Sequence, residues 1–273
     1  MTIHSKIPSI GLGTYMMSPE EAEEMTYEAI KIGYRHIDTA EVYRNEQGVA
    51  KGIERSLSEG LVSRSELFIT TKVFPGNEIW GQSQKTFDDV TESLDNSLKR
   101  LKLEYVDLYL IHSAHANKTR IEQWKALLEL KSMGKITYAG VANWNIKHLQ
   151  EINDADLPLP DTNQIELHPW AQQPELVEYL QNNNVHIIAY SSLVPLSTWR
   201  KKDGENSLKT QDMENEGSSE ESLFKILANK YNVKESQILL QWALQLKYAI
   251  LPKTIKIARL HENYHFSFVI EEE

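Results

Sequence analysis

Four side chains that can give or take a proton stand at the ends of short apolar runs in this chain. Asp38 and Tyr43 lie within the phrase His-Ile-Asp-Thr-Ala-Glu-Val-Tyr. Lys72 ends the run Leu-Phe-Ile-Thr-Thr-Lys, and His112 ends the run Val-Asp-Leu-Tyr-Leu-Ile-His. Such runs are typical of parallel strands, and barrels of parallel strands gather catalytic side chains at the carboxyl ends of their strands. We therefore expect the four residues to meet at one site and to support proton transfer.

Taken singly, each of these residues also has a structural interpretation. Aspartate often caps a helix or a turn, and tyrosine and histidine are often half-buried with a satisfied polar tip. A lysine such as Lys72 can simply pair with a surface carboxylate. Their joint occurrence at the ends of consecutive strands favours the catalytic interpretation. The spacing of His112 and His115 also fits a metal site, but no carboxylate or cysteine is patterned with them, so we expect no metal.

Strand-like runs alternate with amphipathic helical stretches along the chain. A helix is expected to begin at Ser18-Pro-Glu-Glu, where serine is the cap and proline takes the first turn. Another is expected over residues 87–101, where apolar residues recur at helical spacing. Eight strands with intervening helices predict an α/β fold, the closed (β/α)8 or TIM barrel. The expected strands span residues 9–14, 36–40, 67–73, 106–112, 138–141, 162–166, 186–190 and 249–251.

An open doubly wound sheet is the rival architecture for such a rhythm. That sheet usually carries a G-x-G-x-x-G turn after its first strand. The corresponding segment here, Gly11-Leu-Gly-Thr-Tyr-Met, lacks the third glycine. We therefore expect the barrel, and we expect residues 1–273 to form a single domain, since parallel barrels commonly reach about 250 residues.

Composition limits the partners and the compartment. Hydrophobic residues make up 41% of the 273 residues, enough for a sizeable core, and the net charge is -10. An acidic chain is a poor partner for nucleic acid or an anionic membrane, so we expect neither. The absence of cysteine excludes a disulfide framework and a catalytic thiol. The first eight residues lack the apolar run of a signal peptide, so we expect a cytoplasmic protein.

One long irregular stretch, residues 194–221, is rich in Ser, Asn, Asp, Glu and Lys. It lies between the seventh expected strand and a helix expected to begin near Ser222. Its composition fits a mere surface insertion, whereas its position at the carboxyl face of a barrel favours a mobile loop over the site. Both interpretations stay open.

The phrases around the four residues closely resemble those of the aldo-keto reductases, a family of NAD(P)H-dependent carbonyl reductases built on a (β/α)8 barrel. The resemblance runs from about residue 10 to about residue 268. It implies that the chain is a monomeric oxidoreductase that reduces a small aldehyde or ketone to an alcohol with NADPH. The family's catalytic tetrad is matched by Asp38, Tyr43, Lys72 and His112.

The resemblance also implies a role for each member of the tetrad. A cofactor must bring the hydride, because the protein has no redox-active side chain, and Tyr43 donates the proton. Tyrosine has an unperturbed pKa of about 10, and a nearby cation lowers it, so Lys72 is expected to lower the pKa of Tyr43. Asp38 would keep Lys72 charged and oriented. His112 would hydrogen-bond the substrate oxygen. Substrate contacts are implied for Tyr15, Tyr43, Trp80 and His112.

A basic segment, residues 252–263, follows the last expected strand and opens the last helix. It holds Lys253, Lys256 and Arg259 in an otherwise acidic chain. Arginine, lysine and a helix N-terminus all receive phosphate well, although a basic turn can also merely neutralise nearby carboxylates. The resemblance makes this segment the clamp for the adenosine 2′-phosphate and the adenine, and so favours NADPH over NADH. The implied contacts are Lys253, Thr254, Arg259, Glu262 and Asn263.

The resemblance places further residues around the rest of the cofactor. Asn143 and Gln164 are implied for the carboxamide, and Tyr190 for stacking beneath the nicotinamide ring. The other implied cofactor contacts are Gly13, Thr14, Tyr15, Asp38, Ser191 and Leu193.

The chain departs from the family pattern at two places inside the expected site. The usual Ser-Asn pair is Ala142-Asn143 here, which removes one hydroxyl donor and about 1 kcal/mol of cofactor binding. His112 is followed by Ser-Ala-His where members commonly have Trp-Pro, so a large apolar wall of the substrate pocket must come from elsewhere. The candidates for that wall are Trp80, Trp144 and Trp170.

The family's N-terminal hairpin and C-terminal tail are expected to be shortened or absent. Fewer contacts far from the carbonyl then predict an open pocket, broad specificity and a high KM for small aldehydes, unless the chain is an inactive truncated product. Two other functions stay open. The first is a nucleotide-binding regulatory or structural protein with little turnover. Such a protein has no chemical need for a tyrosine-lysine pair, so the intact tetrad argues against it. The second is a barrel for phosphorylated sugars, which leaves the nicotinamide-side residues unexplained.

Overall fold

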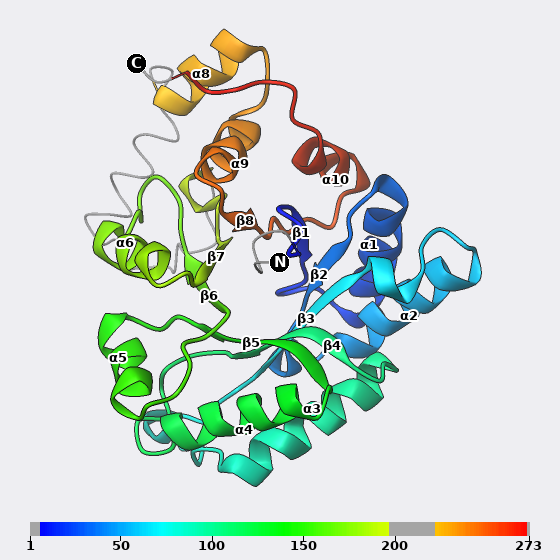
Figure 1. Ribbon diagram of the computed structural model, residues 1–273. Helices are drawn as coiled ribbons and strands as arrows, with labels where there is room; N and C mark the ends of the chain where they lie inside the picture. The colour runs from blue at the N-terminus through cyan, green and yellow to red at the C-terminus, as the bar shows by residue number, and fades with distance from the viewer. Residues whose placement is uncertain (1–5, 197–221, 272–273) are drawn as a thin grey trace.

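The computed structural model describes residues 6–196 and 222–271. Eight parallel strands follow one another in chain order in a single sheet, with the helices outside it (Figure 1). The strands are β1 (Gly11–Gly13), β2 (His36–Asp38), β3 (Phe68–Val73), β4 (Val106–Ile111), β5 (Ile136–Ala142), β6 (Thr162–Glu166), β7 (His186–Tyr190) and β8 (Ala249–Ile250).

The last strand returns to the first, which closes the barrel almost completely. Ile10 and Ile250 form a parallel bridge. The backbone N–H of Ile250 donates to the carbonyl of Ser9 over 2.8 Å, and that of Gly13 donates to Pro252 over 3.2 Å. The predicted parallel (β/α)8 barrel is therefore confirmed, and the open doubly wound sheet is excluded, since an open sheet has no contact between its edge strands.

Helices cover the outside of the strands. In Figure 1, α3 and α4 lie side by side along one side of the barrel, and α8, α9 and α10 gather at the opposite side. The described α-helices are α1 (Pro19–Ile32), α2 (Glu46–Ser58), α3 (Phe87–Leu101), α4 (Arg120–Ser132), α5 (Ile146–Asp154), α6 (Pro174–Asn182), α8 (Leu223–Tyr231), α9 (Glu235–Gln245) and α10 (Ile257–Tyr264). Short 3-10 turns are η2 (Glu41–Tyr43), η3 (Arg64–Glu66), η4 (Glu78–Trp80) and η5 (Val194–Leu196).

The helix starts that local residues predicted are confirmed. Ser18 caps α1 and forms a capping box with Glu21, as serine before proline predicts. Helix α3 has the expected bounds, and α8 starts after Ser222. The strands differ more from expectation: β1 and β2 each have three residues, and β5 starts two residues early, at Ile136. Ile136 joins the strand because it pairs with Val106 of β4, a contact that no local pattern can reveal.

Three predictions fall wholly or partly outside the described residues. Of the expected loop over residues 194–221, only η5 is described. The N-terminal stretch is described from residue 6. Residues 266–271 contain no helix and run along α8 and α9, where the Phe268 ring lies 5.4 Å from the Tyr231 ring.

The alternation of side chains along the strands decides which residues face the interior. Phe68 packs in a cluster with Leu108, Leu110 and Ile188 that contains no helical residue, so this cluster fills the barrel. Ile69 lies in the larger cluster that includes the helices. Because successive side chains of a strand point to opposite faces, the residues at positions 70 and 72 point inward with Phe68. This places Lys72 inside the barrel, at its carboxyl end.

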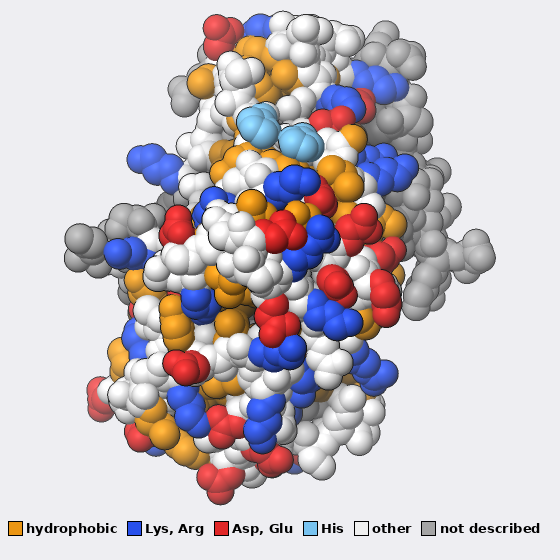
Figure 2. Space-filling view, turned by 90° about the vertical axis from the view of Figure 1, so that its right-hand side faces the viewer, with side chains coloured by type: hydrophobic (Ala, Val, Ile, Leu, Met, Phe, Trp, Pro, Cys, Tyr) orange, Lys and Arg blue, Asp and Glu red, His pale blue; other side chains and the backbone are white. Residues whose placement is uncertain are grey.

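The surface carries charges of both signs in close alternation. Figure 2 shows Lys and Arg side chains interspersed with Asp and Glu over the visible face. Lys51 of α2 pairs with Glu23 of α1, and Arg55 of α2 pairs with Glu59 just after that helix. Within the described part of the chain, no helix combines the length and the apolar character that crossing a bilayer requires.

Helices α1 and α2 flank the turn that carries Tyr43, and they pack at van der Waals limits through Gly48. A Cβ atom added at Gly48 would lie 1.9 Å from the backbone oxygen of Pro19. The backbone oxygen cannot rotate away, so one helix would have to move. Gly48 is thus required by the close approach of the two helices and not by a turn.

We predict that Gly48→Ala destabilises the protein by about 1–3 kcal/mol, the usual cost of overpacking. The sign of this change in unfolding free energy tests the packing, because Gly→Ala inside an unobstructed helix stabilises a protein by about 1 kcal/mol. Urea unfolding followed by circular dichroism measures the change. The exposed neighbour Gln47→Ala is the control and should stay within about 0.5 kcal/mol of the wild type. A stabilised Gly48→Ala protein would contradict the packing described.

Candidate active site

A cavity of about 1420 Å³ opens at the carboxyl ends of the strands and extends to α10. It is larger than the roughly 300–1,000 Å³ of a pocket for one drug-sized ligand, so it has room for a long ligand and a second small one. Most of the predicted site residues line it. They are Gly13, Tyr15, Asp38, Tyr43, Trp80, His112, Asn143, Gln164, Tyr190, Ser191, Leu193, Lys253, Thr254, Arg259, Glu262 and Asn263.

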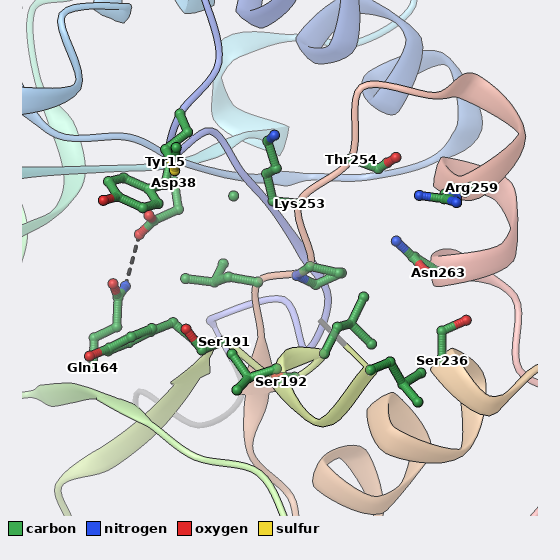
Figure 3. Close-up of a pocket in the computed structure, with 18 of the residues that line it drawn as sticks. Tyr15, Asp38, Gln164, Ser191, Ser192, Ser236, Lys253, Thr254, Arg259 and Asn263 are labelled. Atoms are coloured by element: carbon green, nitrogen blue, oxygen red, sulfur yellow. Dashed lines mark hydrogen bonds between the residues drawn. The ribbon is translucent and has the colours of Figure 1, made fainter. Parts of the chain in front are cut away.

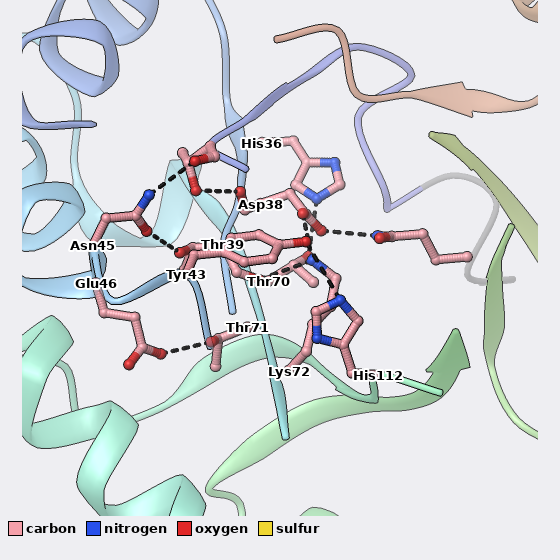
Figure 4. A network of polar contacts seen from close by, with 12 residues as sticks. His36, Asp38, Thr39, Tyr43, Asn45, Glu46, Thr70, Thr71, Lys72 and His112 are labelled. Atoms are coloured by element: carbon pink, nitrogen blue, oxygen red, sulfur yellow. Dashed lines mark hydrogen bonds and ion pairs between the residues drawn. The ribbon is translucent and has the colours of Figure 1, made fainter. Parts of the chain in front are cut away.

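A buried ion pair between Lys72 and Asp38 lies at the inner end of this cavity (Figure 4). The Lys72 Nζ donates to Asp38 Oδ1 over 2.5 Å and to the carbonyl of Thr39 over 2.8 Å. The second carboxylate oxygen of Asp38 accepts from Gln164 Nε2 over 2.8 Å, as Figure 3 also shows. Burial raises the pKa of Asp38 and lowers the pKa of Lys72, and in each case the partner's charge opposes the shift.

Tyr43 and His112 meet above the ion pair. The Tyr43 hydroxyl lies 3.4 Å from His112 Nε2, and the Tyr43 ring centroid lies 5.2 Å from Lys72 Nζ. Figure 4 shows the side chains of Asp38, Tyr43, Lys72 and His112 pointing toward one another. They come from β2, η2, β3 and the residue after β4. The predicted meeting of the four residues is therefore confirmed.

The pKa of Tyr43 differs from the sequence-based expectation. Burial raises the Tyr43 pKa well above its usual value near 10, and the Asp38 carboxylate raises it further. The expected lowering by Lys72 was wrong for the free protein, because Asp38 neutralises the lysine at contact distance. Tyr43 is therefore fully protonated at neutral pH and has a proton to give.

His112 is a neutral imidazole in this site. Burial, followed by the repulsion of the Lys72 cation, lowers its pKa from 6.5 to about 3. Its Nδ1 is buried without a hydrogen-bond partner among the described residues. A neutral histidine beside Tyr43 can hydrogen-bond a ligand oxygen but cannot serve as a charged acid near pH 7.

The low pKa of His112, together with that of His36, predicts a pH dependence of stability. His36 lies inside the barrel, where burial and then Lys72 lower its pKa to about 3. Below pH 6.5 the unfolded chain binds a proton at each histidine and the folded chain does not, so folding free energy is lost as the pH falls.

From pH 7 to pH 5 we expect each histidine to cost about 2 kcal/mol of stability. Urea unfolding at both pH values measures this. In His36→Gln the loss between the two pH values should be about 2 kcal/mol smaller than in the wild type, whatever the variant's stability at pH 7. The exposed His261→Gln is the control and should keep the full loss. A variant His36→Gln with the wild-type pH dependence would contradict the buried neutral histidine.

The residues predicted for a nicotinamide carboxamide lie together beside the tetrad. The Tyr190 hydroxyl donates to Asn143 Oδ1 over 2.7 Å, and Asn143 Nδ2 donates to the carbonyl of His112 over 3.0 Å. Gln164 holds Asp38 through one N–H and keeps its other donor and its oxygen. Asn143 and Ser191 both have a positive φ, near 60°, which turns the chain sharply after β5 and β7.

The basic segment lies at the other end of the cavity. Figure 3 shows Lys253 and Thr254 on the loop before α10, and Arg259 and Asn263 on α10 itself. Lys253 and Arg259 are exposed, and neither forms an ion pair with a described residue. Glu262 pairs instead with Lys234 at the start of α9. Two cations thus line this end of the cavity beside the N-terminal turn of α10, and a helix N-terminus also favours an anion.

A few predicted residues do not line the cavity. Thr14 is buried and its hydroxyl donates to the carbonyl of Asp38, while Lys72 lies behind Asp38. Of the three tryptophans proposed for the substrate wall, only Trp80 lines the cavity. Trp144 is 1% exposed in the core, and Trp170 packs edge-to-face on Phe224. The proposals for Trp144 and Trp170 as cavity walls were therefore wrong, because both side chains point into neighbouring packing.

The structure also brings residues to the cavity for which the sequence predicted no contact with cofactor or substrate. Phe74 comes directly after β3. Site residues of parallel barrels lie at the carboxyl ends of the strands, so the sequence could have predicted this position as well. No local sequence pattern predicts the side chains that α8 and α9 contribute to the cavity, because only tertiary packing brings these two helices to its entrance. The added lining residues are Met16, Val42, Phe74, Ser113, His115, Ser192, Val194, Leu196, Lys225, Ala228, Asn229, Val233, Lys234, Glu235, Ser236, Leu251 and Pro252.

Metal chemistry has little support in the described residues. Among residues 6–196 and 222–271, no three His, Asp or Glu side chains lie close enough together to hold a metal ion. The Nδ1 atom of His115 is 2.7 Å from the Ser113 hydroxyl, so this nitrogen already has a hydrogen-bond partner. The expectation of no metal stays a prediction.

Comparison with known proteins agrees with the geometry. The model of the aldo/keto reductase family matches residues 9–273. The chain is 36% identical to the methylglyoxal reductase DkgA of Yersinia pestis, over 98% of this chain and 86% of that protein. It is also 36% identical to the glyoxal reductase of Bacillus subtilis, with the same coverage. The crystal structure of a Bombyx mori aldo-keto reductase in complex with NADP superposes with a TM-score of 0.82 at 30% identity, over 97% of this chain and 86% of that one.

The chain therefore belongs to the aldo/keto reductase family. It is an oxidoreductase that acts on carbonyl groups, as the family and the reductase relatives define.

Proposed function

We propose that this protein reduces small aldehydes and ketones with NADPH and that Tyr43 supplies the proton. The observation that carries the proposal is the Tyr43 hydroxyl, 3.4 Å from neutral His112, above the buried Lys72–Asp38 pair and at the wall of a cavity large enough for a dinucleotide. The bound cofactor supplies the hydride to the carbonyl carbon.

The residues of the chain handle the oxygen and its proton. Tyr43 and His112 both hydrogen-bond the substrate carbonyl oxygen. As negative charge develops on that oxygen, the Tyr43 proton moves to it, and the alcohol leaves a tyrosinate that regains a proton from solvent. A raised pKa of Tyr43 does not prevent this step, because an alkoxide is about as basic as hydroxide, and the pKa of water is about 15.7.

The Lys72–Asp38 pair acts mainly on the charge that forms during the reaction. In the resting site the two charges balance and Tyr43 stays protonated. When Tyr43 becomes anionic, the Lys72 cation, whose Nζ lies 5.2 Å from the centre of the Tyr43 ring, stabilises that charge in a site that burial has made poor in water. Such an interaction grows toward the transition state and therefore raises the rate.

Tyr43→Phe tests the proton donor. We expect turnover of methylglyoxal to fall by about 10²–10⁴, the usual contribution of general acid catalysis, while the Kd for NADPH changes less than about twofold. Absorbance of NADPH gives turnover, and quenching of tryptophan fluorescence gives the Kd. Tyr138→Phe, in β5 and outside the cavity wall, is the matched control and should keep wild-type turnover.

The same experiment separates the alternatives. Wild type that binds NADPH tightly without turning over any aldehyde would move the protein to the nucleotide-binding regulatory or structural class. A Tyr43→Phe variant with wild-type turnover would refute the role of Tyr43 as proton donor, although the protein would still be a reductase.

NADPH is proposed over NADH because Lys253, Thr254 and Arg259 surround the start of α10 at one end of the cavity. Arg259→Ala should raise the Kd for NADPH about 10- to 100-fold and leave the Kd for NADH within about twofold, since only NADPH carries the 2′-phosphate. Lys256→Ala is the control: Lys256 is exposed on the same turn but does not line the cavity. Equal weakening of both cofactors by Arg259→Ala would contradict a phosphate clamp.

Assembly and location complete the proposal. We propose a single-domain monomer that works in the cytoplasm. The lack of cysteine is compatible with a reducing compartment. Light scattering after size exclusion measures the assembly state.

A further inference from the structure

The first turn of α9 lies against α10 at the end of the cavity that holds the basic segment. Figure 3 shows Ser236 of α9 opposite Asn263 of α10. Gln237 Nε2 donates to the backbone carbonyls of Glu262 and His265, over 3.2 Å in each case. Hydrogen bonds thus connect the two helices here, and side chains from both of them line the cavity.

An ion pair crosses from α9 to α10 at the same place. Nζ of Lys234, the residue just before α9, donates to Oε1 of Glu262 on α10. Both residues line the cavity. The Lys234 side chain is 63% exposed and the Glu262 side chain 28%, and such solvent-exposed pairs add only about 0.2–1 kcal/mol to the stability of a fold. The position of this pair in the cavity wall therefore matters more than its effect on stability.

Glu262 has a second cation within reach on its own helix. Arg259 lies three residues before it on α10, and side chains three residues apart on a helix are neighbours that form ion pairs. Among the described residues, however, Arg259 forms no ion pair, and the Glu262 carboxylate pairs with Lys234. The Arg259 guanidinium lines the cavity and so keeps its N–H donors for a ligand there.

Without the Lys234 cation, the Glu262 carboxylate would oppose the binding of an anion in two ways. It would be free to pair with Arg259 and so occupy the donors that a phosphate needs. Its charge, no longer balanced, would also repel a phosphate bound in the same part of the cavity. Both effects require the negative charge of Glu262.

We propose that Lys234 is a positioning residue for the phosphate clamp: it holds and neutralises Glu262, and this keeps Arg259 available for the 2′-phosphate of NADPH. The inference rests on the proposed use of NADPH. It adds to that function a residue that lies outside the basic segment 252–263 and helps to set the preference for NADPH over NADH. Lys234 acts through Glu262 and does not contact the phosphate itself.

The test measures the ratio of the Kd for NADH to the Kd for NADPH by quenching of tryptophan fluorescence. Low ionic strength is used, because exposed charges are least screened there. The two cofactors differ only in the 2′-phosphate, so changes that affect the adenine or the nicotinamide cancel in the ratio. We expect Lys234→Met to lower the ratio about three- to fivefold by raising the Kd for NADPH. Lys234→Arg keeps the cation and should keep most of the wild-type ratio.

A second substitution separates an effect through Glu262 from direct contact with the phosphate. Glu262→Gln removes the charge of the carboxylate and keeps the length of the side chain. Adding Lys234→Met to Glu262→Gln should change the ratio by less than about twofold, because no carboxylate is left to compete for Arg259. The matched control is Lys230→Met, which removes the Lys230–Glu271 pair outside the cavity wall and should leave the ratio unchanged.

The outcomes separate this inference from the proposed function. An unchanged ratio in Lys234→Met, in a protein whose wild type prefers NADPH, overturns the inference and leaves the phosphate clamp intact. An equal fall of the ratio with and without Glu262→Gln also overturns it, since Lys234 then contacts the phosphate directly. A wild type that binds NADH and NADPH equally well refutes the NADPH preference and this inference together, while turnover of aldehydes with either cofactor would still identify a reductase.

Discussion

The buried Lys72–Asp38 pair is the interaction on which the rest of the site depends. Two charges removed from water are costly, and the ion pair persists only if each charge also finds hydrogen-bond partners. Here Thr39 supplies a carbonyl to Lys72, and Gln164 supplies an amide to Asp38. Those partners come from β6 and from the residue after β2, so the pair forms only when the barrel has closed around it. The geometry of the tetrad therefore depends on the closed barrel.

A second hydrogen-bond network holds the loop that carries Tyr43. Asn45 is fully buried, and its Nδ2 donates to the carbonyls of Thr14 and Met17. Its Oδ1 accepts from Thr39, whose own carbonyl binds Lys72. Figure 4 shows this network running from Asn45 to Lys72. These hydrogen bonds therefore connect the loops after β1 and β2 to the ion pair, and they fix the backbone that positions the Tyr43 side chain.

The electrostatic character of the cavity changes along its length, from balanced charges at the tetrad to unpaired cations at α10. At the tetrad the charges are paired, and burial keeps Tyr43 protonated and His112 neutral. At α10 the cations are exposed and face the cavity in a chain of net charge -10. A site of this kind is suited to a ligand with an anionic end and an uncharged reactive end.

The sequence by itself determined the barrel, the four tetrad residues and the basic segment, because each depends on local pattern: strand periodicity, residues at strand ends, and cations grouped in a short stretch. Only the tertiary structure decided the rest. Val106 extended β5 by pairing with Ile136, and packing turned Trp144 and Trp170 away from the cavity. Contact with Asp38 cancelled the effect of Lys72 on Tyr43, and α8 and α9 supplied a wall with no local signal. Pairing, burial and charge compensation depend on residues distant in the chain, so no window of sequence contains them.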